Sequence, residues 1–392
     1  MRVLLCHNYY TQAGGEDQVF HSELDLLRRN GYETRAYTVS NEKIAHWCKP
    51  RAWLASAWNP GVYWELGRIL RQFRPHVVHV HNFFAVLSPS VYWAARNAGA
   101  AVVQTFHNFR LICPQATFLR EGRPCEDCLE ARSYLPAVRH RCYRGEFVPT
   151  FGLSAAFGLH WFAGTWPGMI DRAIVLSHFA RGKFAAAGLP ADRLCVKYNT
   201  LSADPGPRHG PGQYYLYAGR LSEEKGIGLL LAVWRNDPEL PPLLVAGEGP
   251  LEGSVSRHAA AAGNIRRLGP LPRSELLKLL QGARALVIPS RCYESFPMVL
   301  AEAMACGVPV IAPAHGPFPE VIEPGRHGYL FVPGGDGSLA EAVRHMEAAP
   351  DAWAPMSAAC RQQYLRLCSP EAGMRTLARI YQDAMERAAT AA

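Results

Sequence analysis

Residues 294–310 of this 392-residue chain read ESFPMVLAEAMACGVPV, and this stretch decides the fold class. An apolar run ends at Ile288 shortly before it, and a polar loop follows. We expect a helix to start near Phe296, because Pro297 suits the first turn of a helix, where its missing N–H is tolerated. Gly307 is expected to end that helix, and another apolar run follows at once. A strand, a helix and a strand in close succession predict a parallel sheet covered by helices.

The same alternation of strands and helices runs through both halves of the chain. Strands are expected at residues 3–5, 34–38, 77–81 and 101–106, and again at 214–218, 243–246, 285–288, 308–312 and 328–332. A stretch rich in Pro and Gly, without periodicity, separates the two sets and is typical of a linker. We predict two doubly wound α/β lobes, with these boundaries: an N-terminal lobe at 1–200, a linker at 201–213, a C-terminal lobe at 214–369 and a final helix at 370–392 that could pack back on the first lobe.

Two carboxylates frame the helix predicted inside residues 294–310. Glu294 would lie just outside its N-terminus and Glu302 about two turns further in. A helix N-terminus attracts anions through its unpaired N–H groups. Two carboxylates beside such a place would suit the hydroxyls next to a bound phosphate. The structural alternative is a capping carboxylate and a solvated helix residue.

This segment resembles the E-x7-E signature of glycosyltransferase family 4, a group of retaining enzymes with the two-lobed GT-B fold. Further segments resemble other motifs of that family: Gly219-Arg220 to Lys225-Gly226, Gly247-Glu248-Gly249-Pro250, Pro319 to Ile322 and Gly328 to Leu330. The resemblance spans the chain and is densest from Tyr217 to Val332. It implies two Rossmann-like lobes facing a central cleft, and transfer of a sugar from a nucleotide diphosphate to an acceptor hydroxyl with retention of configuration. It implies no catalytic metal.

The resemblance also implies roles for individual residues. Arg220 and Lys225 would hold the diphosphate and stabilise its charge as the sugar leaves. Glu294 would hold the donor sugar and Glu302 the ribose, while His107 would contact the sugar near the reacting carbon. The other donor-binding residues that we expect are Gly14, Gly15, Gly247, Gly249, Ser295, Phe296, Pro297 and Met298.

Two prolines depart from the family pattern. Pro297 and Pro317 stand where many relatives have Gly. Each removes a backbone N–H that could have bound a phosphate or a sugar.

Four cysteines crowd into one window of the first lobe, namely Cys113, Cys125, Cys128 and Cys142. Such a density in a reducing compartment predicts a structural zinc site, with His140 as an alternative ligand. The alternative is a chance cluster of thiols. We expect this insertion to shape the acceptor pocket without taking part in the chemistry.

The composition bounds the partners and the compartment. The formal net charge is +8, yet dense Lys/Arg stripes are absent, so we expect no nucleic acid partner. No apolar run is long enough to span a bilayer, and the short run at residues 3–6 does not resemble a signal peptide. We therefore expect a cytoplasmic protein. The positive charge favours an anionic membrane surface or the phosphates of a substrate, or serves solubility alone.

A segment rich in aromatic residues, 151–170, could touch the membrane. It could equally be a helix packed on the sheet.

These expectations combine into one functional prediction. The chain is expected to transfer a sugar from a nucleotide-diphosphate sugar, with UDP or GDP as the nucleotide, to a hydroxyl acceptor that could be lipid-linked, in surface polysaccharide or glycolipid synthesis. Two alternatives remain. One is a non-hydrolysing nucleotide-sugar epimerase of the same fold, and the other is an inactive nucleotide-sugar-binding scaffold.

Overall fold

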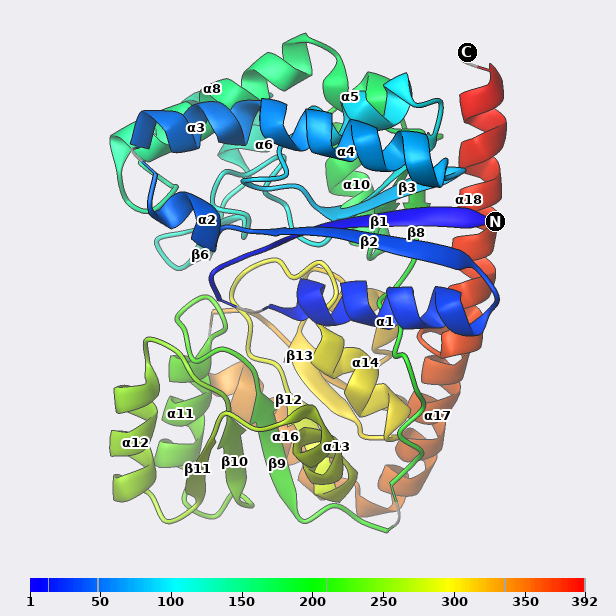
Figure 1. Ribbon diagram of the computed structural model, residues 1–392. Coiled ribbons are helices and arrows are strands. Elements are labelled where there is room, and N and C mark those ends of the chain that lie inside the picture. Colours follow the sequence, from blue (N-terminus) through cyan, green and yellow to red (C-terminus); the bar gives the residue numbers. More distant parts are fainter. Residues whose placement is uncertain (13, 48, 209, 335, 391–392) are drawn as a thin grey trace. The chain divides into compact units, whose positions relative to one another are not determined.

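The computed structural model describes residues 1–12, 14–47, 49–208, 210–334 and 336–390 (Figure 1). His209 of the predicted linker and the last two residues of the predicted final helix lie outside these ranges. The chain divides into two compact units. The first unit contains residues 1–116, 126–202 and 373–392, and the second contains residues 117–125 and 203–372.

The first unit is built on a sheet of six parallel strands in the order β2-β1-β3-β4-β7-β8. Their bounds are β1 Arg2–Tyr9, β2 Glu33–Ser40, β3 Val77–Asn82, β4 Ala101–Phe106, β7 Arg172–Val175 and β8 Leu194–Val196. The direction of winding reverses between β1 and β3. In doubly wound sheets, ligands bind outside the carboxyl ends of the strands at such a switch point.

Helices cover both faces of this sheet. On one face, apolar residues of α1 (Gly15–Arg29) and α18 (Pro370–Thr390) pack with Val3, Leu5 and Val103 of the strands. On the other face lie α4 (Pro60–Phe73) and α5 (Ser90–Asn97), which contact each other (Figure 1). The remaining helices of this unit are α2 Glu42–Ala45, α3 Lys49–Ala57, α6 Asp127–Glu130, α7 Leu135–Arg139, α8 Phe147–Phe162, α9 Thr165–Met169 and α10 His178–Ala186.

The second unit holds another sheet of six parallel strands, in the order β11-β10-β9-β12-β13-β14. Their bounds are β9 Tyr214–Ala218, β10 Leu243–Ala246, β11 Ile265–Gly269, β12 Ala283–Val287, β13 Val310–Pro313 and β14 Gly328–Phe331. Numbered along this unit, the order is 3-2-1-4-5-6, which is that of dinucleotide-binding sheets. Its switch point lies between β9 and β12.

The helices of the second unit follow its strands in turn. They are α11 Ile227–Asn236, α12 Glu252–Ala261, α13 Arg273–Gly282, α14 Met298–Ala305, α15 Phe318–Val321, α16 Asp336–Ala348 and α17 Trp353–Leu367, with a 3-10 turn at Pro350–Ala352. A two-stranded ribbon of β5 (Leu119–Arg120) and β6 (Arg123–Pro124) also belongs to this unit. The two parallel sheets, each flanked by helices, confirm the predicted fold class of two doubly wound lobes.

One predicted element begins at a different residue. The helix expected to start near Phe296 begins at Met298, and Pro297 is its N-cap in an extended conformation with φ of −69° and ψ of 137°. A residue in that conformation cannot belong to the first helical turn. The placement of Pro297 in the first turn was therefore wrong by one position.

Candidate functional site

The predicted catalytic residues of the second unit lie at the switch point of its sheet. Arg220 and Lys225 lie between the end of β9 and α11, and Glu294 lies between β12 and α14. Because the winding reverses between β9 and β12, a crevice is expected outside the carboxyl ends of this pair of strands. Side chains carried by the two loops can therefore face a ligand there.

Glycine at position 226 brings these two loops together. Gly226 is the N-cap of α11 and has a left-handed φ of +73°. A Cβ atom at this position would lie 1.9 Å from the carbonyl oxygen of Pro289, in the loop after β12. Only glycine permits both the dihedral angle and the close approach.

Two further predicted glycines allow another close approach. A Cβ atom on Gly247 would lie 1.9 Å from the carbonyl oxygen of Gly219, and one on Gly249 would lie 2.6 Å from that of Leu221. The loop after β10 therefore packs backbone to backbone against the loop that carries Arg220. In addition, the Tyr217 hydroxyl donates to the carbonyl of Arg220 at 2.6 Å, which fixes the course of the chain there. The side chain of Arg220 itself is exposed.

Lys225 and Glu294 form an ion pair at this place. The Lys225 ammonium donates to Glu294 Oε1 at 2.6 Å, and the Ser290 hydroxyl donates to the same oxygen at 2.7 Å. Burial raises the pKa of Glu294, but the Lys225 charge and these two hydrogen bonds outweigh it, so the pKa lies below its ordinary value. Burial lowers the pKa of Lys225, and Glu294 more than compensates for this. Both groups are therefore charged near neutral pH.

Two buried polar side chains in and just before α14 have an atom without a hydrogen bond to any described residue. In the described part of the chain, the buried Ser295 Oγ and the buried Glu302 Oε1 have no hydrogen-bond partner. Arg273 Nε lies 3.0 Å from Glu302 Oε1, close enough for an ion pair but without hydrogen-bond geometry. Burial raises the pKa of Glu302, and Arg273 opposes this rise. Buried polar atoms without a partner are uncommon in proteins and are typical of places where a ligand binds.

The two prolines leave part of the backbone donor set intact. Pro297 is the N-cap of α14, so the amides of Met298 and Val299 belong to its first turn, where amides have no intrahelical acceptor. Pro317 is likewise an N-cap, of the short helix α15. The neighbouring Gly316, with φ of +63°, brings that loop beside Glu294: a Cβ atom on Gly316 would lie 3.7 Å from the Glu294 backbone.

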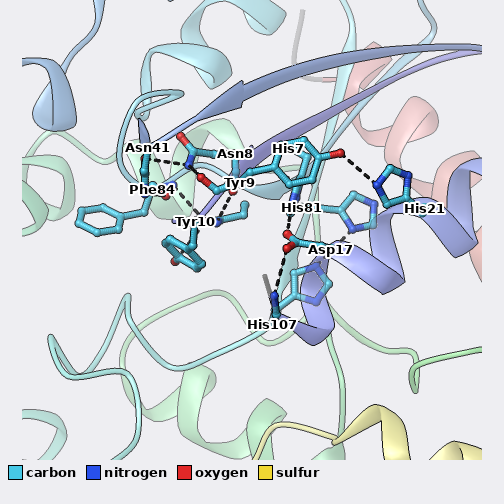
Figure 2. A network of polar contacts seen from close by, with 12 residues as sticks. His7, Asn8, Tyr9, Tyr10, Asp17, His21, Asn41, His81, Phe84 and His107 are labelled. Carbon is cyan, nitrogen blue, oxygen red and sulfur yellow. Dashed lines mark hydrogen bonds and ion pairs between the residues drawn. The ribbon is translucent and has the colours of Figure 1, made fainter. Parts of the chain in front are cut away.

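In the first unit, the predicted donor-binding residues Gly14 and Gly15 lie at the switch point of the other sheet. Gly14 is the N-cap of α1, and Gly15 is its first residue. Asp17 holds this segment, because one of its carboxylate oxygens accepts from the Gly14 amide at 3.0 Å and the other accepts from His7 Nε2 at 2.7 Å. Figure 2 shows His7, Asp17, His81 and His107 lying close together there.

His107, the histidine predicted from the family resemblance, directly follows β4 and is half-buried. Its Nε2 lies 3.2 Å from Nδ1 of His81, the second histidine of β3 (Figure 2). Burial lowers the pKa of His107 well below the ordinary value, and the nearby His7, His79 and Lys197 lower it further. His107 is therefore neutral at physiological pH.

The sequence did not indicate a buried polar cluster behind this histidine. Glu23 of α1 and Lys197, which follows β8, form an ion pair of 2.5 Å, and both are almost fully buried. His79 and His81 lie beside them. One signal was present in the sequence: Glu23 stands on the apolar face of its helix, three residues after Phe20 and four before Leu27.

The four cysteines of the predicted zinc site lie in short segments: Cys113 after β4, Cys125 after β6, Cys128 in α6 and Cys142 after α7. Over the described ranges, one set of three potential metal ligands has its ligand atoms within 4.8 Å of one another, and it consists of Glu23, His79 and His81. The cysteines form no such set, and the alternative ligand His140 is exposed. The zinc site stays a prediction, which metal analysis of the purified protein can test.

Among the described residues, no helix is long and apolar enough to span a bilayer.

Comparison with known proteins bears on both units. Residues 14–200 match the family model "Glycosyl transferase 4-like domain", and residues 204–363 match "Glycosyl transferases group 1". Glycogen synthase of Mycobacterium tuberculosis is 35% identical over 163 residues, which are 40% of this chain and 39% of the synthase. The chain thus matches about two fifths of the length of that relative.

Solved structures share the fold over nearly the whole chain. The sucrose-phosphate synthase from Thermosynechococcus elongatus has a TM-score of 0.73 at 17% identity, over 98% of this chain and 100% of that one. The Anabaena protein HepE, solved in complex with UDP-glucose, has a TM-score of 0.66 at 14% identity, over 97% and 99%. Because the two glycosyltransferase family models together take in most of the residues, and these structures share the fold over nearly the whole chain, the chain belongs to the family 4-like glycosyltransferases with the GT-B fold.

Proposed function

We propose that the protein transfers a glycosyl group from a nucleotide-diphosphate sugar to an acceptor hydroxyl, with retention at the anomeric carbon. One observation carries the proposal: the Lys225–Glu294 ion pair at the switch point of the second sheet, held by the close approach of Gly226. A charged pair of this kind places a cation for a phosphate and a carboxylate for sugar hydroxyls within 3 Å of each other.

The chemistry follows from the charges involved. The bond between the anomeric carbon and the diphosphate oxygen breaks, and a bond to the acceptor oxygen forms on the same face of the sugar. The acceptor proton passes to the departing phosphate. Arg220 and Lys225 stabilise the negative charge that develops on the diphosphate, a type of stabilisation that is often worth a factor of about 10²–10³ in rate.

Ser295 Oγ and Glu302 Oε1, which have no hydrogen bond among the described residues, suit the ribose and phosphate parts of the donor. The Glu302 carboxylate accepts hydrogen bonds from ribose hydroxyls, and Ser295 and the first amides of α14 lie nearby for a phosphate or a sugar. UDP is the first nucleotide to try, because HepE was solved with UDP-glucose. GDP is the second.

Thermal unfolding in the presence of UDP, GDP, ADP or TDP at equal excess tests the donor site. A nucleotide at about 100 times its dissociation constant stabilises the folded protein by roughly 2.7 kcal/mol. Lys225→Met should remove that shift. Arg326→Met is the matched control, because Arg326 pairs with Glu323 on the exposed surface of the same unit. If no nucleotide raises the unfolding temperature, or if both variants keep the shift, the donor-site assignment is wrong.

A transfer assay then separates the proposed function from its alternatives. A purified enzyme that releases UDP or GDP only when an acceptor is present is a transferase. Conversion of the nucleotide sugar to an epimer without any acceptor would indicate the epimerase. Nucleotide binding with neither reaction would indicate the scaffold.

We also propose that the first unit touches an anionic membrane, where a lipid-linked acceptor would lie. Helix α8 buries one side, including Leu153 and Phe157, and exposes apolar side chains on the other. The exposed set, here called the α8 apolar face, is more than half exposed at each position and consists of Phe147, Val148, Phe151, Leu159 and Phe162. Helix α3 packs beside it, since a Cβ atom on Gly152 would lie 2.9 Å from the Trp53 ring.

Positive charge adjoins the α8 apolar face. Arg139, Arg141 and Arg144 are exposed in the segment just before α8. An apolar helix face with neighbouring arginines is the arrangement by which peripheral proteins bind anionic lipid. The buried side of α8 fits the interpretation of a packed helix, and its exposed apolar side supports the proposed membrane contact.

Co-sedimentation with vesicles tests this surface. Binding should be stronger to phosphatidylglycerol vesicles than to phosphatidylcholine vesicles, and the double variant Phe151→Ser/Leu159→Ser should weaken it about 10-fold or more through lost apolar burial. Leu365→Ser is the control, because Leu365 is an exposed leucine of the second unit. Equal binding by the double variant and the control would refute the proposed membrane contact.

A further inference from the structure

The buried cluster of the first unit connects directly to His107. It consists of Glu23, His79, His81 and Lys197, and each of these side chains is at most 3% exposed. The proposed transfer chemistry uses none of them. Their arrangement determines which nitrogen of His107 carries a proton.

The two oxygens of Glu23 have different neighbours. Oε1 accepts from the Lys197 ammonium at 2.5 Å. Oε2 lies 3.4 Å from His81 Nε2, and within the described residues neither of these two atoms has a hydrogen-bond partner. A buried polar atom left unpaired is costly, so a small movement that joins the two is favoured.

His79 does not compete for this carboxylate oxygen. Its Nδ1 is hydrogen-bonded to the Tyr381 hydroxyl at 2.8 Å, and its Nε2 to the Thr105 hydroxyl at 2.7 Å. Glu23, His79 and His81 have the composition of a metal site. A divalent cation there would displace Tyr381 and lie beside the buried Lys197 ammonium, which already neutralises Glu23.

The hydrogen-bond partners of His81 and His107 indicate which ring nitrogen of each carries the proton. Burial lowers the pKa of both His81 and His107 well below the ordinary value, so each ring is neutral and has one N–H. A carboxylate can only accept, so His81 carries its proton on Nε2, facing Glu23. Nδ1 of His81 is then bare and must accept from Nε2 of His107, 3.2 Å away.

We propose that Glu23 and His81 are positioning residues that fix His107 as the Nε2–H tautomer. Nδ1 of His107 then bears a lone pair that can accept a hydrogen bond from a sugar hydroxyl. This role rests on the proposed function and on the contact between His107 and the sugar that the family resemblance implies. The donor sugar must present a hydroxyl to that nitrogen, because a deoxy position leaves the lone pair unsatisfied and a carboxylate is repelled by it.

The tautomer can be observed without any substrate. In protein labelled with 15N-histidine, two-bond correlations from the ring carbon protons identify the protonated nitrogen of each ring, and His107→Ala assigns the His107 signals. The expected result is a proton on Nε2 of both His81 and His107 in the wild-type protein. A His107 ring protonated on Nδ1 overturns the proposal. A His81 Nε2 without a proton also overturns it, as would occur if a metal ion occupied the cluster.

Glu23→Gln should reverse the direction of the hydrogen bonds that run from residue 23 through His81 to His107. The Gln carbonyl oxygen would accept from Lys197, and its amide would donate to His81 Nε2. His81 would then carry its proton on Nδ1, and His107 would become the Nδ1–H tautomer. Tyr381→Phe is the matched control, because it removes a hydrogen bond from His79 in the same cluster but leaves the Glu23–His81–His107 line intact. If Glu23→Gln does not fold, the wild-type spectrum still tests the tautomer.

Kinetics connect the tautomer to turnover. Glu23→Gln should lower kcat roughly 10- to 100-fold with little change in the KM for the donor, whereas Tyr381→Phe should keep kcat within a few-fold of wild type. A reversed tautomer with unchanged kcat overturns the positioning role. Failure of the wild-type protein to transfer sugar would instead refute the proposed function, and the wild-type spectrum distinguishes the two failures.

Discussion

Gly226→Ala tests whether the close approach of Gly226 to Pro289 holds the site together, by its effects on stability and on turnover. The left-handed φ of +73° alone costs an alanine about 1–2 kcal/mol. The added Cβ would also lie 1.9 Å from the Pro289 carbonyl oxygen, a backbone atom that cannot rotate away. Overpacking of this kind costs about 1–3 kcal/mol in addition. We therefore expect the free energy of unfolding of the second unit to fall by about 2–5 kcal/mol.

The same clash should move Lys225 away from Glu294. Gly226 directly follows Lys225, and the loop after β12 that it touches carries Ser290 and Glu294. A displacement of about 1 Å of a catalytic group can cost on the order of 10²-fold in rate. Turnover of the donor should therefore fall at least about 10-fold at temperatures where the variant is still folded.

Gly325→Ala is the matched control for this comparison. Gly325 belongs to the same unit and has a nearly identical φ of +76°, but a Cβ atom there would meet nothing within 4 Å. It should lose only about 1–2 kcal/mol and keep its turnover. Thermal unfolding of both variants gives the change in stability, and an assay of donor turnover gives the change in rate. If the two variants behave alike, the close approach at Pro289 does not hold the site together.

Three further perturbations test the electrostatics. Lys197→Met should destabilise the first unit by about 3–5 kcal/mol, because it leaves the buried Glu23 carboxylate unpaired, and Glu23→Gln in the same chain should restore part of this in urea unfolding. The pKa of Glu294 lies below its ordinary 4.5, so the pairing with Lys225 should stabilise the protein above that pH and be lost as the pH falls through the lowered value. Lys225→Met should abolish this part of the pH dependence of the unfolding temperature. Burial lowers the pKa of His79 from 6.5 to about 4, so stability should fall as the pH falls through that interval, and less so in His79→Gln.

Most interior strands could be predicted from the sequence, because both of their faces are covered. Strands β3 and β4 are buried at every position and are mostly apolar; their polar residues are His79, His81 and Asn82 in β3 and Gln104 and Thr105 in β4. Three strands of the two parallel sheets were not predicted: the interior strand β7, which has only four residues, and the edge strands β8 and β11. β8 has three residues, and β11 contains Arg266 and Arg267, because an edge strand has a neighbour on one side only and tolerates charge.

Lys225 and Glu294 were each expected in the site, since each lies a few positions beyond a predicted strand, but their ion pair was seen only in the structure. The pairing of Glu23 with Lys197 could not be predicted in this way. These residues are 174 positions apart in the sequence. They meet because Glu23 belongs to α1, which packs on the sheet, and Lys197 follows β8 of the same sheet. The charge of Glu23 on the apolar face of α1 was a signal that the prediction did not use, and it could not have identified Lys197 as the partner.

Helix α18 has a consequence for how the protein is made on the ribosome. Its residues from Gly373 onward belong to the first unit, and Met374, Leu377, Ile380 and Tyr381 share a core with Val3 and Phe20. During synthesis, residues 1–202 therefore leave the ribosome well before α18. The apolar surface that α18 covers stays exposed until the second unit has been made. A nascent chain in that interval is the species that a chaperone would hold, and a ribosome stalled before residue 373 would release an incomplete domain.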